Sequence, residues 1–118
     1  MKAINKIWLK GLIEDGNDEL LKEMKSGYLS SCKLNDLHPE EKSIVMLIDH
    51  YLSSKKELLI LIESEALNGR PDAIDCYLDG FYASCTPTYK WMEAPGQSGW
   101  DIDYGEILFT VDDSLFEE

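Results

Sequence analysis

The chain has 118 residues, of which 44% are hydrophobic and 29% charged, and its 23 acidic side chains against 11 basic ones leave a net charge of −12. This length suits one domain, and the hydrophobic content argues against a disordered chain. The acidic excess disfavours direct binding to nucleic acid, because phosphate contacts depend on clustered Lys and Arg. We therefore predict a single domain over residues 1–118.

Periodic apolar residues in the first quarter of the chain predict two helices. Within residues 3–13, Ile4, Ile7 and Trp8 recur on one helical face, and we expect this face to pack into the core. A short turn with Asp-Gly character ends this helix. A second, shorter helix is expected over residues 17–27.

The middle of the chain predicts a third and a fourth helix. Pro39 suits the first position of a helix, and the apolar residues from Ile44 to Leu52 then follow the helical period. The sequence Ser54-Lys55-Lys56-Glu57 matches a capping box and precedes the apolar run Leu58–Ile62. We predict a fourth helix there, and a buried strand stays open as the alternative, because short apolar runs suit both.

A fifth helix is predicted from Pro71 through Tyr82. Its start follows from proline at a first helical position. Asp72, Asp75 and Asp79 then fall on one face at i, i+3 and i+7, so this helix is expected to carry an acidic patch.

Beyond Thr86-Pro87 the pattern becomes that of strands. Residues 88–92 are rich in strand-forming types, residues 100–104 alternate apolar with Asp, and residues 107–111 form another strand-like run. Gly105 is expected to mark a bulge or a turn. The predicted fold is α+β: a mostly helical body of about five helices with a small C-terminal antiparallel sheet. A lone hairpin is marginally stable, so we expect the sheet to pack on the helices.

No motif of catalysis or metal binding occurs in the sequence. His38 and His50 are each isolated, and we expect His38 to cap a helix and neither residue to be catalytic. The three cysteines are widely spaced and are expected to be reduced thiols of a cytoplasmic protein. The N-terminal segment has no apolar run typical of a signal peptide or a membrane span. We predict no enzyme activity, no cofactor and no metal.

Asp101 and Asp103 are the one carboxylate pair that suggests chemistry. On one face of a strand they lie about 6.6 Å apart by strand rise, a separation that suits acid/base work or a divalent cation. No flanking motif supports either use, and acids that alternate with aromatics on a strand more often form a solvated face. We favour core packing for Trp91 and Trp100 and an outward, partner-facing role for the aspartates.

The acids are unevenly distributed along the chain. Residues 1–59 hold nine lysines and ten acids, a net charge of −1, whereas residues 60–118 hold Arg70, Lys90 and thirteen acids, a net charge of −11. Like charges repel in the folded state, so such an excess suggests a use. It predicts a binding protein whose partner is basic.

In its length, its acidity, its lack of catalytic motifs and its acid-rich segments 100–104 and 112–113, the chain resembles a bacterial immunity protein. Such proteins neutralise contact-dependent or other polymorphic toxins. The resemblance is one of profile and carries no family motif. It implies a cytoplasmic protein that blocks a toxin domain, often a nuclease with a basic substrate groove.

The predicted mechanism is occlusion of the toxin's active site or groove by carboxylates around aromatic anchors. The residues expected to bind the partner are Trp100, Asp101, Asp103, Tyr104, Asp112 and Asp113, with Asp72, Asp75 and Asp79 as a second patch.

Two other functions stay open. The first is a DNA mimic that inhibits a nucleic-acid-binding protein, which requires the acids of helix and sheet to merge into one elongated band, since B-DNA carries a charge about every 1.7 Å of its axis. The second is a carboxylate-based enzyme, which requires a deep cleft that holds Asp101 or Asp103.

Overall fold

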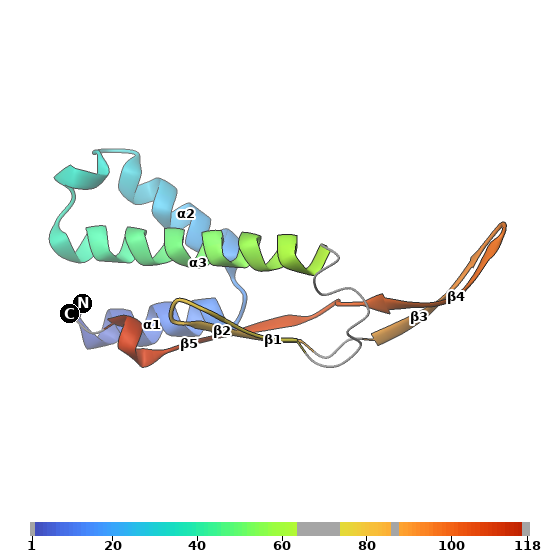
Figure 1. Cartoon of the computed structure of the whole chain (residues 1–118). Coiled ribbons are helices and arrows are strands. Elements are labelled where there is room, and N and C mark those ends of the chain that lie inside the picture. Colours follow the sequence, from blue (N-terminus) through green and yellow to red (C-terminus); the bar gives the residue numbers. More distant parts are fainter. Residues whose placement is uncertain (1, 64–73, 86–87, 117–118) are drawn as a thin grey trace.

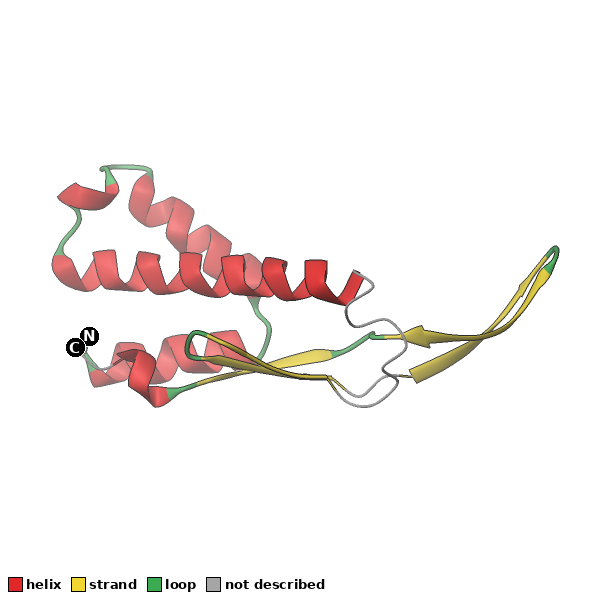
Figure 2. Cartoon of the chain, in the orientation of Figure 1, coloured by secondary structure: helices red, strands yellow, loops and turns green. Residues whose placement is uncertain are grey.

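The computed structural model describes residues 2–63, 74–85 and 88–116. Of the three α-helices, α1 (Ala3–Glu14) and α3 (Pro39–Glu63) lie against a sheet, and α2 (Asp18–Leu29) packs on α3, away from the sheet (Figure 1). Two 3-10 turns, η1 (Leu34–Asp36) and η2 (Asp113–Phe116), complete the helical part. The strands are β1 (Ile74–Leu78), β2 (Phe81–Cys85), β3 (Thr88–Ala94), β4 (Gln97–Asp103) and β5 (Ile107–Val111), as Figure 2 shows in yellow. The α+β class is confirmed, and the described residues form three α-helices rather than five.

The third and fourth predicted helices are one continuous helix, α3. The capping-box motif at residues 54–57 does not start a new helix, because Ser54 is buried within α3 and nothing in the segment breaks the helical period. The run Leu58–Ile62 is helical, so the strand alternative is wrong. At the start of α3, the backbone N–H of Glu40 donates to His38 Nδ1 at 3.3 Å, which is the predicted capping role.

The fifth predicted helix is wrong where the structure describes it. Residues 74–85 form the hairpin β1–β2, and its two-residue turn is Asp79-Gly80. Asp79 has φ 38° and Gly80 has φ 92°, the two positive values that a type I′ turn requires, and Asp-Gly is a preferred pair for it. The strand period of two outweighs the helical spacing of the aspartates, because it puts every second side chain of Phe81–Cys85 into the core. Asp72 lies outside the described residues.

β1, β2 and β5 form an antiparallel sheet in the order β1-β2-β5. One face packs on the helices and buries Phe81, Ala83, Phe109 and Val111. His50 on α3 fixes the position of the β1–β2 turn, since its Nε2 lies 2.7 Å from the carbonyl oxygen of Asp79. The sheet is thereby held over the middle of α3.

The helix α1 packs on the core through a different face from the one predicted. Leu9 and Ile13 are fully buried, whereas Ile4 and Ile7 are each 74% exposed. Both sets recur at a helical spacing, so the sequence contains two apolar stripes on this helix. Packing against β5 and α2 selects the stripe that carries Leu9 and Ile13.

A polar network joins α2 to α3 beside the core. Asp18, at the start of α2, accepts hydrogen bonds from the hydroxyl of Tyr51 at 2.6 Å and from Lys55 Nζ at 2.5 Å. Tyr51 is fully buried, and burial together with the negative charge of Asp18 raises the pKa of its hydroxyl. The network gives the buried hydroxyl the partner that it needs away from water.

The hairpin β3–β4 continues β2 and β5 beyond the ends of the helices (Figure 1). Residues 104–106 separate β4 from β5, whereas only two residues separate β2 from β3, so the pairing shifts by one residue. Gly105, where a bulge or a turn was predicted, lies in the connection between β4 and β5. The molecule is therefore elongated, with extents of 59 × 28 × 21 Å.

Replacing Gly80 by Ala distinguishes the observed hairpin from a helix, because the free energy of unfolding should fall in a hairpin turn and rise in a helix. Gly80→Ala should destabilise the fold by about 1 to 3 kcal/mol, because Ala is strained at positive φ and its Cβ would lie 2.9 Å from Leu115 Cδ1. Gly11→Ala is the matched control, since Gly11 lies inside α1 with no atom near an added Cβ; it should stabilise by about 0.5 to 1 kcal/mol. Urea unfolding measures both, and a stabilising Gly80→Ala would contradict the turn.

Candidate functional site

The hairpin β3–β4 is the most prominent surface feature of the molecule. Its strands pair in register from Thr88 with Asp103 to Ala94 with Gln97. The turn is Pro95-Gly96, and Gly96 has φ 81°, which suits the second position of a tight turn that proline opens. The hairpin projects from the end of the molecule opposite to the two termini (Figure 1).

One face of this hairpin carries aromatic side chains. Trp91 and Trp100 are directly opposed, with ring centroids 5.3 Å apart and planes at 77°, and Tyr89 follows on the same face. The exposed fractions are 51% for Tyr89, 52% for Trp91 and 69% for Trp100. Core packing was the expected role of both tryptophans, and that expectation is wrong because both side chains are half or more exposed and none of the helices that the structure describes covers this face. We call these three residues the aromatic face.

The opposite face of the hairpin carries Asp103. Asp103 pairs with Lys90 at 2.7 Å, and this contact raises the pKa of Lys90. Asp101 lies opposite Lys90 in the strand register. The one lysine among the described residues of the C-terminal half is thus engaged by the predicted acidic strand, which reduces the charge that Asp103 presents outward.

Tyr104 does not extend the aromatic face. It lies at the base of the hairpin, after β4, where it is half-buried and packs against the core. Its predicted neighbour Trp100 is exposed on the hairpin. The structure therefore separates the two aromatics that the sequence placed together.

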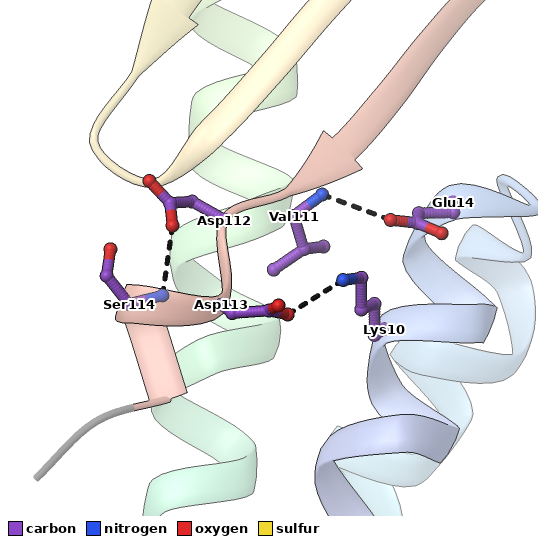
Figure 3. A network of polar contacts seen from close by, with 6 residues as sticks. All are labelled: Lys10, Glu14, Val111, Asp112, Asp113 and Ser114. Atoms are coloured by element: carbon purple, nitrogen blue, oxygen red, sulfur yellow. Dashed lines mark hydrogen bonds and ion pairs between the residues drawn. The ribbon is translucent and has the colours of Figure 1, made fainter.

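Asp112 and Asp113 lie at the other end of β5 (Figure 3). Asp113 pairs with Lys10 of α1 at 2.7 Å, which raises the pKa of Lys10. Asp112 accepts the backbone N–H of Ser114 at 2.9 Å, and this bond lowers the pKa of Asp112. Beside them, the N–H of Val111 reaches Glu14 at 3.4 Å. Asp113 therefore ties η2 to α1, and Asp112 holds the connection between β5 and η2.

The second predicted patch is also divided. Asp75 is exposed on β1, and Asp79 is in the β1–β2 turn. Asp103 and Asp112 are nine residues apart along nearly extended chain, which corresponds to about 30 Å. Within the described part of the chain, the predicted acids thus occupy separate places on an elongated molecule.

Tyr89 and Trp91 were not among the residues predicted to bind the partner. The alternation of residues 88–92 places both on one strand face, and a pairing of this strand with residues 100–104 puts them beside Trp100. The sequence did not reveal that this face lies uncovered by the described helices α1, α2 and α3. That information lies in the lengths of α3 and of the strands, which were not predicted correctly.

Other chemistry is sparse in the residues that the structure describes. They contain no cluster of three His, Cys, Asp or Glu side chains placed to hold a metal ion. Cys32, Cys76 and Cys85 are free thiols, and burial raises the pKa of Cys85. Among the described helices, none has the length and hydropathy to cross a bilayer.

Comparison of the chain with protein-family models, with curated proteins and with solved structures gives no match in any of the three. The candidate site therefore rests on its own geometry.

Because Asp112 accepts a hydrogen bond within the fold, replacing it by Asn should reduce stability by an amount that depends on pH. Its pKa is lowered from 3.8 in the folded state, so its ionised form contributes stability that is present above pH 3.8 and is lost as the pH falls through the folded value. Asp112→Asn should lower the urea midpoint at pH 7, and the difference from the wild type should be smaller at pH 2, where more of the wild-type carboxyl is protonated. An equal loss at both pH values would contradict an ionic contribution.

Proposed function

We propose that the chain is a binding protein that neutralises a basic protein partner in the cytoplasm, and that the partner is a toxin of the nuclease type. In this proposal the chain is an immunity protein, and the hairpin β3–β4 is the arm that docks. One observation carries it: Tyr89, Trp91 and Trp100 are half or more exposed on one face of a hairpin that projects from the body.

The aromatic face has the composition of an interface centre. Trp and Tyr are enriched among the residues that dominate binding energy, because each buries a large area and loses little side-chain entropy. A two-stranded hairpin is marginally stable by itself. A partner that covered Trp91 and Trp100 would remove apolar area from water and stabilise the hairpin in the same step.

The charge of the chain supports a basic partner. Residues 60–118 have a net charge of −11, and this excess persists although Asp103 and Asp113 are paired within the chain. An acidic field accelerates encounter with a cationic groove and disfavours acidic partners. A narrow arm with Tyr89, Trp91 and Trp100 on one face, where Glu93 accepts the indole N–H of Trp91 at 3.4 Å, and with Asp103 on the other suits occlusion of a concave, basic active site.

The geometry supports this function better than the two alternatives. A DNA mimic needs one elongated acidic band, and the described members of the predicted patches lie in separate regions. A carboxylate enzyme needs a cleft, and Asp103 lies on a projecting strand in contact with Lys90.

Loss of the aromatic face should abolish partner binding without unfolding the body. We expect Trp100→Ala to weaken binding about 30-fold, in line with about 2 kcal/mol for a central aromatic anchor. The measurement uses tagged full-length chain to capture a basic protein from cells of its source, and then titrates the purified pair by calorimetry. The urea midpoint of the variant should match that of the wild type, because the hairpin lies outside the core.

The control is Tyr77→Ala, which removes an aromatic side chain that is 61% exposed on the outer face of the sheet, away from the hairpin. It should leave affinity unchanged. The captured protein should also arrest growth when it is expressed alone, and co-expression of wild-type chain should restore growth. Equal binding by the Trp100 and Tyr77 variants would refute the docking arm, and a captured protein without toxicity would refute the immunity role.

A further inference from the structure

A groove of about 380 Å³ lies at the foot of the hairpin, between the end of α1, the middle of α3 and the start of β5. This volume is within the range of about 300 to 1,000 Å³ that ligand sites occupy. The helical walls include Glu14, Asp15 and Lys55, and the strand wall runs from Tyr104 to Phe109. None of these residues belongs to the aromatic face.

The strand wall of the groove is a sheet edge. β5 is the last strand in the order β1-β2-β5. The N–H of Val111 leaves the sheet to reach Glu14, so the amide of Val111 faces away from β2. Amide directions alternate along an antiparallel strand. The amides of Ile107 and Phe109 therefore face the groove, while that of Leu108 faces β2.

The interaction between Glu14 and Val111 shows how this edge is satisfied where α1 covers it. A carboxylate oxygen takes the place that the carbonyl of a neighbouring strand would occupy. The helix ends at Glu14 and the chain turns away at Asp15. Beyond that point, beside Ile107 and Phe109, the groove lies along the edge.

The charge of the groove selects its occupant. Three carboxylates line it, those of Glu14, Asp15 and Glu106, and its one lysine, Lys55, is already paired with Asp18 at 2.5 Å. A second copy of this chain, with a net charge of −12, would bring further negative charge to these carboxylates. An extended segment with Lys or Arg would complement them.

We propose that this groove binds an extended basic segment of a partner protein, which adds as a strand to β5 at Ile107 and Phe109. Backbone hydrogen bonds to the edge supply the pairing, as in other cases of strand addition. Glu14, Asp15 and Glu106 select alternate Lys or Arg side chains of the segment. This site does not depend on the hairpin being the docking arm.

The test titrates full-length chain with a blocked five-residue peptide that alternates Lys with Val, and it follows the chain by NMR. We expect saturable shifts and slower hydrogen exchange at the amides of Ile107 and Phe109, with no added protection at Leu108, which is already bonded within the sheet. The peptide is added to about 5 mM, because millimolar affinity is expected of so short a segment. The control peptide replaces each Lys by Glu and should not bind.

Charge reversal tests whether the carboxylates that line the groove bind the lysines of the peptide. The double variant Asp15→Lys with Glu106→Lys should lower affinity for the Lys peptide about five- to tenfold, on the scale of two exposed charge pairs. The charge-matched control, Glu23→Lys with Glu57→Lys, changes exposed acids outside the groove and should bind as the wild type does. Trp91→Ala with Trp100→Ala should also bind the peptide normally, which keeps this result separate from that of the hairpin.

The proposal is overturned if the peptide gives no saturable shift at 107 and 109, if the exchange of these amides is not slowed, or if both double charge variants lose affinity equally. In the last case the peptide recognises net charge rather than the groove.

Discussion

The fold depends on the environment of the Tyr51 ring. From the middle of α3, the ring meets Phe109 edge-on, with centroids 5.4 Å apart, and Phe81 at 5.7 Å, while its hydroxyl donates to Asp18 on α2. One buried side chain thus contacts α2, β2 and β5. A tyrosine is tolerated at this depth only because a carboxylate accepts its hydroxyl. The two strands that it orients are the ones from which the hairpin β3–β4 extends, so the direction of the proposed docking arm is set in the core.

The charges of the chain are used in two ways. Three lysines of the first half pair with aspartates of other elements. Lys10 of α1 pairs with Asp113 of η2, and α2 and α3 are joined by two pairs, Lys25 with Asp49 and Lys55 with Asp18. Asp103 and Asp113 of the predicted acidic surface belong to such pairs. The solvent-exposed pairs of Asp103 and Asp113 contribute little stability individually, whereas the Lys55–Asp18 pair is more buried. All of these pairs fix where their carboxylates point. The acidic excess therefore acts as a general field around the molecule, and in the proposed function the choice of partner falls to shape and to the aromatic face.

Sequence patterns predicted the elements whose period is strong and whose ends are marked. The start of α3 at Pro39 and the strand character after Thr86 are examples. The hairpin at residues 74–85 was missed because Ile74, Leu78 and Phe81 also fit a helical spacing, and the Asp79-Gly80 turn was not weighed against it. For the candidate site, alternation correctly put Trp100 and Asp103 on opposite faces of a strand. Alternation could not show which face a helix would bury. That depends on where α3 ends relative to the sheet, which is decided by tertiary packing.

The shift in pairing at residues 104–106 has a consequence for how this protein diversifies. It separates a sheet that is buried against helices from a ribbon that is exposed on both faces. Substitutions in the ribbon do not disturb the packing of the hydrophobic core, so under the proposed function they are filtered by partner recognition alone. If the hairpin is the proposed docking arm, a lineage with this architecture can change the residues of the arm quickly to follow a changing target, while the body that presents it stays the same.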